Sequence, residues 1–216
     1  LFINFKPYPE ASGLKAIKLA KICQSVSLNS KIPIIPCVQA VDLSSVIKEI
    51  NIPVWVQHLD PMVNGQHTGS VTAEAVKSYG GGGTLLNHSE HPLGFEDLKK
   101  TVSLAKETGL KTLALAKDLK TAKTIDGLKP DYLGLEEPSL IGSGTAMVKS
   151  EALRKIISQF VSQTKNAIPI IGAGISTPED IKQSLALGAK GVLVASALVL
   201  AKDPQSVLQE MAKAFY

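Results

Sequence analysis

Eight short apolar runs, separated by longer stretches with apolar residues at helical spacing, most constrain what this chain can fold into. The runs lie at residues 2–5, 32–35, 53–56, 84–86, 111–115, 132–135, 168–171 and 191–194. Strands that are apolar throughout and are joined by helices form parallel sheets covered on both faces. Eight strand–helix pairs in 216 residues predict an α/β protein, a single (β/α)8 barrel with shortened helices, because about 250 residues are typical of such barrels.

Helix boundary signals agree with this pattern. The segment Ser176–Asp180 offers capping hydroxyls, a proline and two acidic residues for a helix start, and Asp203–Pro204 begins the last helix in the same way. Gly109 and Gly188 follow helical segments, where glycine commonly ends a helix. No linker or low-complexity segment interrupts the chain. We therefore predict one domain over residues 1–216, a barrel catalytic domain.

Composition argues against several classes of protein. Apolar residues make up 44% of the chain, enough for a core, and no apolar run reaches the ~18 residues of a membrane span. The first residues lack the pattern of a signal peptide. The net charge is +4 with scattered basic residues, so we expect a small anionic partner and neither nucleic acid nor membrane. Cys23 and Cys37 lie in apolar contexts, which predicts reduced thiols in a cytoplasmic protein.

Candidate catalytic residues follow the strands at their carboxyl ends, where barrels place their active sites. Lys6 follows the first strand, His88 the fourth and Glu136 the sixth. Together they offer a cation, a neutral hydrogen-bond donor and a base, and a carboxylate shielded from water can abstract a carbon-bound proton. Each also has a plainer interpretation, as a solvated strand end, a rim histidine or a surface glutamate.

Loops of small residues follow the last three strands and are candidates for binding phosphate. They are Ile141–Gly144, Gly172–Ser176 and Ala195–Ser196. Glycine-rich turns expose backbone N–H groups, which can hold an anion with few cationic side chains. A Gly-x-Gly sequence alone is equally typical of a tight turn, but the position after the seventh and eighth strands favours a phosphate site.

A metal site is the competing hypothesis for the same edge of the barrel. The chain offers imidazole and carboxylate groups at His58, Asp60, His67, His88 and His91. Their spacing matches no recognised ligand motif, so we expect no bound metal.

Four motifs in this order resemble the triosephosphate isomerase family, and the resemblance covers essentially the whole chain. They are Asn4-Phe5-Lys6, Leu86-Asn87-His88-Ser89-Glu90, Glu136 five residues before Ile141-Gly142-Ser143-Gly144, and Gly172-Ala173-Gly174-Ile175-Ser176. The compact length, together with Gln57-His58-Leu59-Asp60-Pro61 and His67-Thr68-Gly69, is similar to short archaeal-type members.

The resemblance implies a TIM barrel and a cofactor-free isomerase. It would interconvert dihydroxyacetone phosphate and D-glyceraldehyde 3-phosphate through an enediolate, in glycolysis and gluconeogenesis. Glu136 would carry the proton between adjacent carbons, His88 would act as a neutral electrophile, and Lys6 would stabilise the negative charge. A helix expected directly after His88 would disfavour the imidazolium form, because the positive end of the helix dipole opposes a second positive charge. Glu90 would support these three residues without touching the substrate.

The resemblance also implies how substrate binds. Residues 138–149 would form a closing lid. The substrate-binding residues would be Asn4, Lys6, Ile141, Gly142, Gly174, Ala195 and Ser196.

Two adjacent carboxylates compete for the role of base. The family spacing to Ile141 falls on Glu136, and side chains alternate along a strand, so Glu137 should face away from the barrel mouth.

The chain departs from the family pattern at three places. Ala197 replaces a glycine and would crowd an amide near the phosphate, Glu137 precedes Pro138 in the lid hinge, and Leu115 replaces a cysteine.

A homo-oligomer is expected, with a tetramer preferred over a dimer. The segment Asp60–Ser70 is long for a connection between strand and helix, and in this family the corresponding loop packs into a neighbouring subunit.

Two other functions stay open. One is a non-catalytic barrel that binds a phosphate ester, and the other is a metal-dependent pentose-phosphate epimerase.

Overall fold

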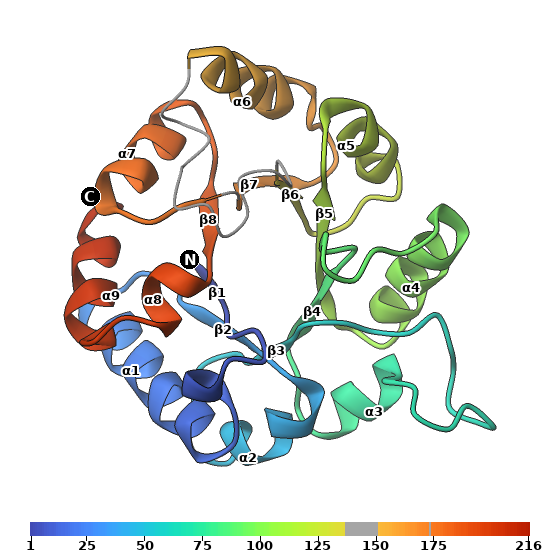
Figure 1. Ribbon diagram of the computed structural model, residues 1–216. Coiled ribbons are helices and arrows are strands. Elements are labelled where there is room, and N and C mark those ends of the chain that lie inside the picture. The colour runs from blue at the N-terminus through green and yellow to red at the C-terminus, as the bar shows by residue number, and fades with distance from the viewer. Residues whose placement is uncertain (137–150, 173) are drawn as a thin grey trace.

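The computed structural model describes residues 1–136, 151–172 and 174–216, and in it eight parallel strands close into a barrel in chain order (Figure 1). The lid segment 138–149, with Ile141 and Gly142, lies outside the described residues. The strands are β1 (Phe2–Asn4), β2 (Ile35–Val38), β3 (Trp55–Val56), β4 (Gly83–Leu86), β5 (Lys111–Ala116), β6 (Tyr132–Leu135), β7 (Ile168–Ile171) and β8 (Gly191–Val194). Pairing of β8 with β1 completes the ring, so the predicted (β/α)8 barrel is confirmed.

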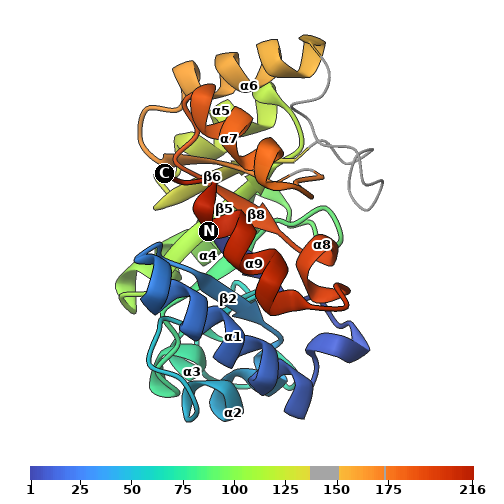
Figure 2. The ribbon, with the colours of Figure 1, turned by 90° about the vertical axis from the view of Figure 1, so that its left-hand side faces the viewer.

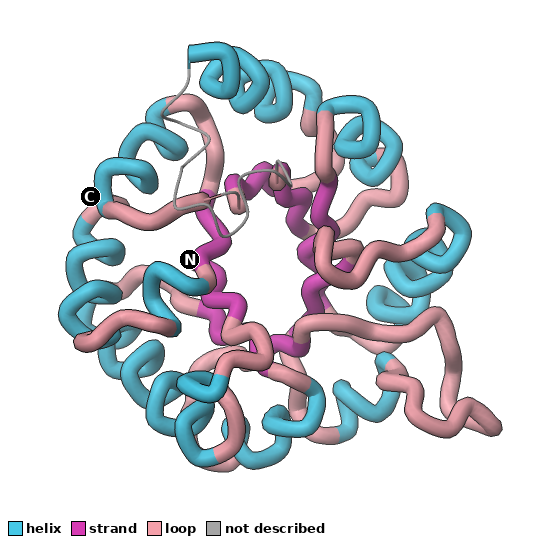
Figure 3. Tube along the Cα trace, in the orientation of Figure 1, coloured by secondary structure: helices cyan, strands magenta, loops and turns pink. Residues whose placement is uncertain are grey.

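Helices form an outer ring around the strands (Figure 3). They are η1 (Pro9–Ala11), α1 (Leu14–Ser30), η2 (Ala40–Asp42), α2 (Leu43–Ile47), α3 (Ala73–Ser78), α4 (Phe95–Glu107), α5 (Leu119–Asp126), α6 (Glu151–Gln163), α7 (Pro178–Ala186), α8 (Ser196–Val199) and α9 (Pro204–Lys213). The first and last long helices, α1 and α9, pack side by side (Figure 2). Among the described helices none is both long and apolar enough to cross a membrane.

Capping residues explain where several helices begin and end. Thr177 and Asp180 form a reciprocal capping box at the start of α7, and Asp203 accepts a hydrogen bond from the Ser206 amide at the start of α9. Gly109 and Gly188 have φ of +72° and +98°, respectively, which glycine adopts without steric cost. The helix boundaries predicted from these residues are therefore confirmed.

The second strand is displaced from its predicted position. The apolar run at 32–35 was expected to form it, whereas β2 spans Ile35–Val38. Phe2 of β1 pairs with Ile35 and Asn4 pairs with Cys37, so the register against β1 selects the later residues. The apolar sequence continues through Val38, and periodicity alone cannot locate a short strand inside such a run.

The hydrophobic core has two parts. A large cluster lies between the barrel and the helices, and a smaller one includes Phe2, Cys37, Trp55 and Leu113 from the strands. In the smaller cluster the ring of Phe2 meets those of Trp55 and Tyr132 edge-on, each at a centroid distance of 5.1 Å. Cys23 and Cys37 are buried and free of disulfides, as predicted. This packing holds the strands rigidly and leaves their carboxyl ends to form a site.

Candidate active site

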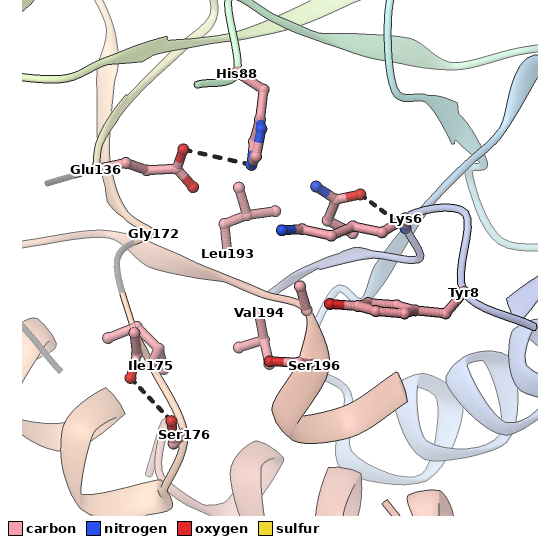
Figure 4. Close-up of a pocket in the computed structure, with 13 residues that line it drawn as sticks. Lys6, Tyr8, His88, Glu136, Gly172, Ile175, Ser176, Leu193, Val194 and Ser196 are labelled. Atoms are coloured by element: carbon pink, nitrogen blue, oxygen red, sulfur yellow. Dashed lines mark hydrogen bonds and ion pairs between the residues drawn. The ribbon is translucent and has the colours of Figure 1, made fainter. Parts of the chain in front are cut away.

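A cavity at the carboxyl ends of the strands brings together side chains from distant parts of the chain (Figure 4). Its empty volume is about 530 Å³. It is lined by Asn4, Lys6, Tyr8, His88, Glu136, Gly172, Gly174, Ile175, Ser176, Leu193, Val194, Ala195 and Ser196. The described residues that we predicted for catalysis and substrate binding therefore all line one cavity.

Lys6 stands in the loop that follows β1. Its backbone has a positive φ of +47°, and the Asn4 side-chain oxygen accepts a hydrogen bond from its amide at 3.1 Å. The Lys6 ammonium group, largely buried, lies 2.5 Å from a carboxylate oxygen of Glu90. Asn4 thus holds the turn that places the ammonium group over the barrel mouth, and Glu90 contacts it directly.

His88 follows β4, and its imidazole has a defined tautomer. The Glu90 amide donates to Nδ1 at 3.1 Å, so the proton of the neutral ring is carried by Nε2. Burial lowers the pKa of His88 from its ordinary value of 6.5 to about 4, against the raising effect of Glu90. The ring is therefore neutral at pH 7 and offers an N–H group to the cavity.

The reason for this neutrality differs from the expected one. A helix was predicted directly after His88, but a turn follows, in which the His91 amide donates to the His88 carbonyl, and α4 begins only at Phe95. The expected helix start directly after His88 is therefore wrong, and with it the expected placement of the imidazole in the first turn of a helix. Desolvation by burial is the largest cause of the lowered pKa of His88. Asn87 shapes this loop, since its side chain donates to the Leu115 carbonyl and accepts from the Leu93 amide.

Glu136 directly follows β6 and is 4% exposed. Its Oε2 lies 3.6 Å from Nε2 of His88, and this oxygen has no hydrogen-bond partner within the described parts of the chain. Burial raises the pKa of Glu136 from 4.5 to about 7, although the charge of Lys6 lowers it. A desolvated carboxylate with a pKa near neutrality is suited to accept and release protons at physiological pH.

Gly172, at the end of β7, provides the space that the Glu136 side chain occupies. A Cβ at this position would lie 2.7 Å from Oε1 and 2.8 Å from Cγ of Glu136. The absence of a side chain at Gly172 therefore sets the position of the carboxylate.

The loops after β7 and β8 supply backbone to the same cavity through Gly174, Ala195 and Ser196. Gly174 has a φ of +64°. The amides of Ser176 and Thr177 already donate to Asp180, so they belong to the start of α7. The Ala197 side chain packs against the core and is not among the cavity residues.

Of the five candidate metal ligands, His88 lines this cavity and the other four do not. His58 and His91 stack on each other at 3.8 Å and line a neighbouring cavity, and Asp60 accepts a hydrogen bond from the Val71 amide. In the described parts of the chain no group of three or more His, Cys, Asp or Glu side chains could hold a metal ion.

Several cavity residues were missed by sequence reasoning. Tyr8 lines the cavity two residues after Lys6, and Leu193 and Val194 also contribute to its wall, whereas Ile175 and Ser176 belong to the loop that was predicted. The position of Tyr8 in the loop after β1 was a usable signal, because such loops form the active face of a barrel. The apolar residues Leu193 and Val194 gave no such signal, since apolar residues at a strand end are also typical of a hydrophobic core.

A closed (β/α)8 barrel whose mouth holds an ammonium group, a neutral imidazole and a buried carboxylate has the architecture of an acid–base enzyme. The family model described as triosephosphate isomerase matches residues 1–214. The chain is 39% identical over 215 residues to the triosephosphate isomerase of Methanocaldococcus jannaschii, covering 99% of this chain and 98% of that protein.

Other relatives agree. The triosephosphate isomerase of Archaeoglobus fulgidus is 36% identical over 213 residues, which cover 98% of this chain and 96% of that protein. The crystal structure of the Bartonella henselae triosephosphate isomerase superposes with a TM-score of 0.77 at 15% identity, covering 100% of this chain and 98% of that one, and supports the fold. The chain belongs to the triosephosphate isomerase family and is an isomerase.

Proposed function

We propose that this protein interconverts dihydroxyacetone phosphate and D-glyceraldehyde 3-phosphate through an enediolate, as a step of glycolysis and gluconeogenesis in the cytoplasm. The proposal treats residues 1–216 as one catalytic domain that needs no cofactor. The observation that carries it is the pairing of the buried Glu136 carboxylate with the neutral His88 imidazole at 3.6 Å. A protein that only binds a phosphate ester needs neither group in this state.

Glu136 is the proposed proton carrier. Its carboxylate removes a proton from the carbon next to the substrate carbonyl and returns it to the adjacent carbon. The pKa of about 7 makes the group a stronger base than an exposed glutamate, while about half of it remains ionised at pH 7.

His88 and Lys6 are proposed to stabilise the charge that develops during proton transfer. The Nε2–H of the neutral His88 ring donates to the carbonyl oxygen and then to the enediolate oxygen, since the Glu90 amide occupies Nδ1. The ammonium group of Lys6 adds a positive charge on the same side of the cavity, and Asn4 holds its backbone. The Glu90 carboxylate keeps Lys6 in place until an anionic substrate competes for it.

Substrate phosphate is proposed to bind at the opposite wall of the cavity. The backbone of Gly174, Ala195 and Ser196 lines this wall, and we expect Ile141 and Gly142 of the segment 138–149 to contribute from above. Enclosure of the substrate would exclude water and protect the enediolate from losing phosphate.

A coupled assay with D-glyceraldehyde 3-phosphate tests the proposal. We expect formation of the ketose, with no loss of activity in the presence of a chelator. A purified chain that binds the phosphate ester but forms no ketose would support the non-catalytic interpretation. Turnover of a pentose phosphate that is abolished by a chelator would support the epimerase.

We also propose that the chain forms a homo-oligomer through the segment Asp60–Ser70, with a tetramer preferred. This loop extends beyond the ring of helices between β3 and α3 (Figure 1). Its base is closed by hydrogen bonds between Asp60 and Val71, and Thr72 donates to Asn64. Two apolar side chains are available on the surface for such a contact. Val63 of this segment is 49% exposed, and Val41, which lines the neighbouring cavity of His58 and His91, is 83% exposed. Light scattering that gives a monomer at micromolar concentration would contradict this proposal.

A further inference from the structure

We propose that Tyr8 is an additional substrate-binding residue, whose phenolic hydroxyl donates a hydrogen bond to a phosphate oxygen of the substrate. The inference rests on the proposed function, because it assigns the phosphate end of the same cavity. Tyr8 lines this cavity together with Lys6, Ala195 and Ser196.

The backbone around Tyr8 is held on its carboxyl side. Its carbonyl accepts hydrogen bonds from the Ala11 amide at 2.9 Å and from the Ser12 hydroxyl at 2.9 Å. The residue stands in extended conformation directly before η1, with Pro9 as the first residue of that helix. The direction in which the side chain leaves the loop is therefore well defined.

The ring and the hydroxyl of Tyr8 have different surroundings. The ring packs against the hydrophobic core as a partly buried side chain. The hydroxyl points into the cavity, toward the end of β8 and Ser196 (Figure 4). It donates to no acceptor in the parts of the chain that the structure describes. A tyrosine whose ring is packed and whose hydroxyl faces a polar cavity is arranged to bind a ligand, since such hydroxyls usually find a partner.

The chemistry of the cavity favours a neutral donor at this position. A phosphate monoester needs several hydrogen-bond donors, and Gly174, Ala195 and Ser196 carry no cationic side chain with which to supply them. A second cation would attract the anion but would also lower the pKa of Glu136, as Lys6 already does. The hydroxyl of Tyr8 adds a donor without adding charge, so it can hold the anion and leave the base intact.

The substitution Tyr8→Phe tests the inference, because it removes the hydroxyl and keeps the packed ring. We expect the inhibition constant of inorganic phosphate and the KM for D-glyceraldehyde 3-phosphate to rise about tenfold, as for the loss of a hydrogen bond to a charged group. The kcat should change much less. Tyr79→Phe is the matched control, since Tyr79 is 61% exposed at the end of α3, away from the cavity, and should leave both constants unchanged.

The outcomes separate this inference from the proposed function. If the wild-type chain isomerises the substrate but Tyr8→Phe leaves both constants unchanged, Tyr8 only packs and the inference is wrong. If the wild-type chain shows no isomerase activity and Tyr8→Phe still weakens phosphate binding tenfold, the proposed function fails and the inference holds.

A second measurement does not depend on folding of the variant. The chain has 4 tyrosines, so a wild-type sample labelled at the tyrosine ζ carbon gives few NMR signals. We expect inorganic phosphate to shift the Tyr8 signal, identified by elimination with Tyr79→Phe, Tyr132→Phe and Tyr216→Phe. A Tyr8 signal that stays in place at saturating phosphate would overturn the inference.

Discussion

Two buried carboxylates, Glu136 and Asp126, differ in what surrounds them. They are almost equally hidden from solvent, at 4% and 6% exposure. Asp126, at the end of α5, accepts hydrogen bonds from the backbone amides of Lys165, Asn166 and Ala167, and from the Asn166 side chain. Oε2 of Glu136 has no hydrogen-bond partner within the described residues and lies 3.6 Å from Nε2 of His88.

The difference shows how the same chemical group serves structure in one place and, in the proposed function, chemistry in the other. Donors around Asp126 satisfy its carboxylate oxygens and tie the end of α5 to the loop before β7. Glu136 is desolvated without such compensation, which raises its pKa to about 7. Burial alone therefore does not mark an active carboxylate. A carboxylate that is buried and also lacks hydrogen-bond donors is the better marker. Burying Glu136 in this way lowers the free energy of unfolding, whereas the hydrogen bonds of Asp126 offset the cost of its burial.

The substitution Glu136→Gln should have the largest effect. It keeps the shape of the side chain and removes the proton carrier, so we expect kcat to fall about 10³-fold in the coupled assay. The melting temperature should not fall, because the change removes a buried group that is poorly stabilised when charged. Glu137→Gln is the matched control and should largely retain activity. Equal losses in the two variants would show that the assignment of the base is wrong.

Gly172→Ala tests whether the position of Glu136 is decisive. The new Cβ would lie 2.7 Å from Oε1 and 2.8 Å from Cγ, so the Glu136 side chain must leave its present position beside His88. A shift of this size should lower kcat roughly 100-fold. Gly94→Ala is a suitable control, because the nearest atom to a Cβ there, in Asp97, lies at an ordinary 3.7 Å. An unchanged rate in Gly172→Ala would mean that the cavity adjusts freely.

Asp126→Asn should affect stability and not chemistry. An amide at this position can accept fewer of the hydrogen bonds that the carboxylate receives, so the free energy of unfolding should fall by roughly 2 kcal/mol. Chemical denaturation measures this change, and kcat should stay at the wild-type value. A large loss of activity without a loss of stability would remove the contrast between the two carboxylates.

The pH dependence gives a smaller but more specific effect. Because the pKa of Glu136 is about 7 and that of His88 about 4, kcat/KM should fall about tenfold per pH unit below pH 7 with a single acid limb. A midpoint near 4.5 would show that Glu136 is solvated.

The same titration has a consequence for stability. The pKa of Glu136 is raised on folding, so its contribution to stability is present below pH 4.5 and is lost as pH rises toward 7. The wild-type chain should therefore lose stability relative to Glu136→Gln across this range. Parallel unfolding curves of the two proteins at each pH would contradict the raised pKa.

Much of the fold could be predicted because its signals are local. Seven of the eight strands match the predicted apolar runs to within two residues at either end, and capping residues such as Thr177 and Asp203 mark helix starts. The exception is β2, which lies three residues later than predicted, at Ile35–Val38. Its position depends on pairing with β1, which is a relation between distant segments.

The site was predicted in composition but not in its interactions. Lys6, His88 and Glu136 share a cavity as expected, because parallel strands end at one edge of the barrel. The direct contact between Lys6 and Glu90 and the place of Tyr8 in the cavity wall were not foreseen. Both depend on side-chain directions and loop conformations, and for Tyr8 the residue pattern indicated only its position in a loop of the active face.

By itself, the sequence determined the alternation of strands and helices, and with it the edge on which the polar residues would gather. Only the tertiary structure decided the chemical state of those residues. The protonation of His88 and Glu136 depends on how much water the surrounding chain excludes and which donors it brings close. Desolvation and hydrogen bonding act through space, so they follow from packing between residues far apart in the chain.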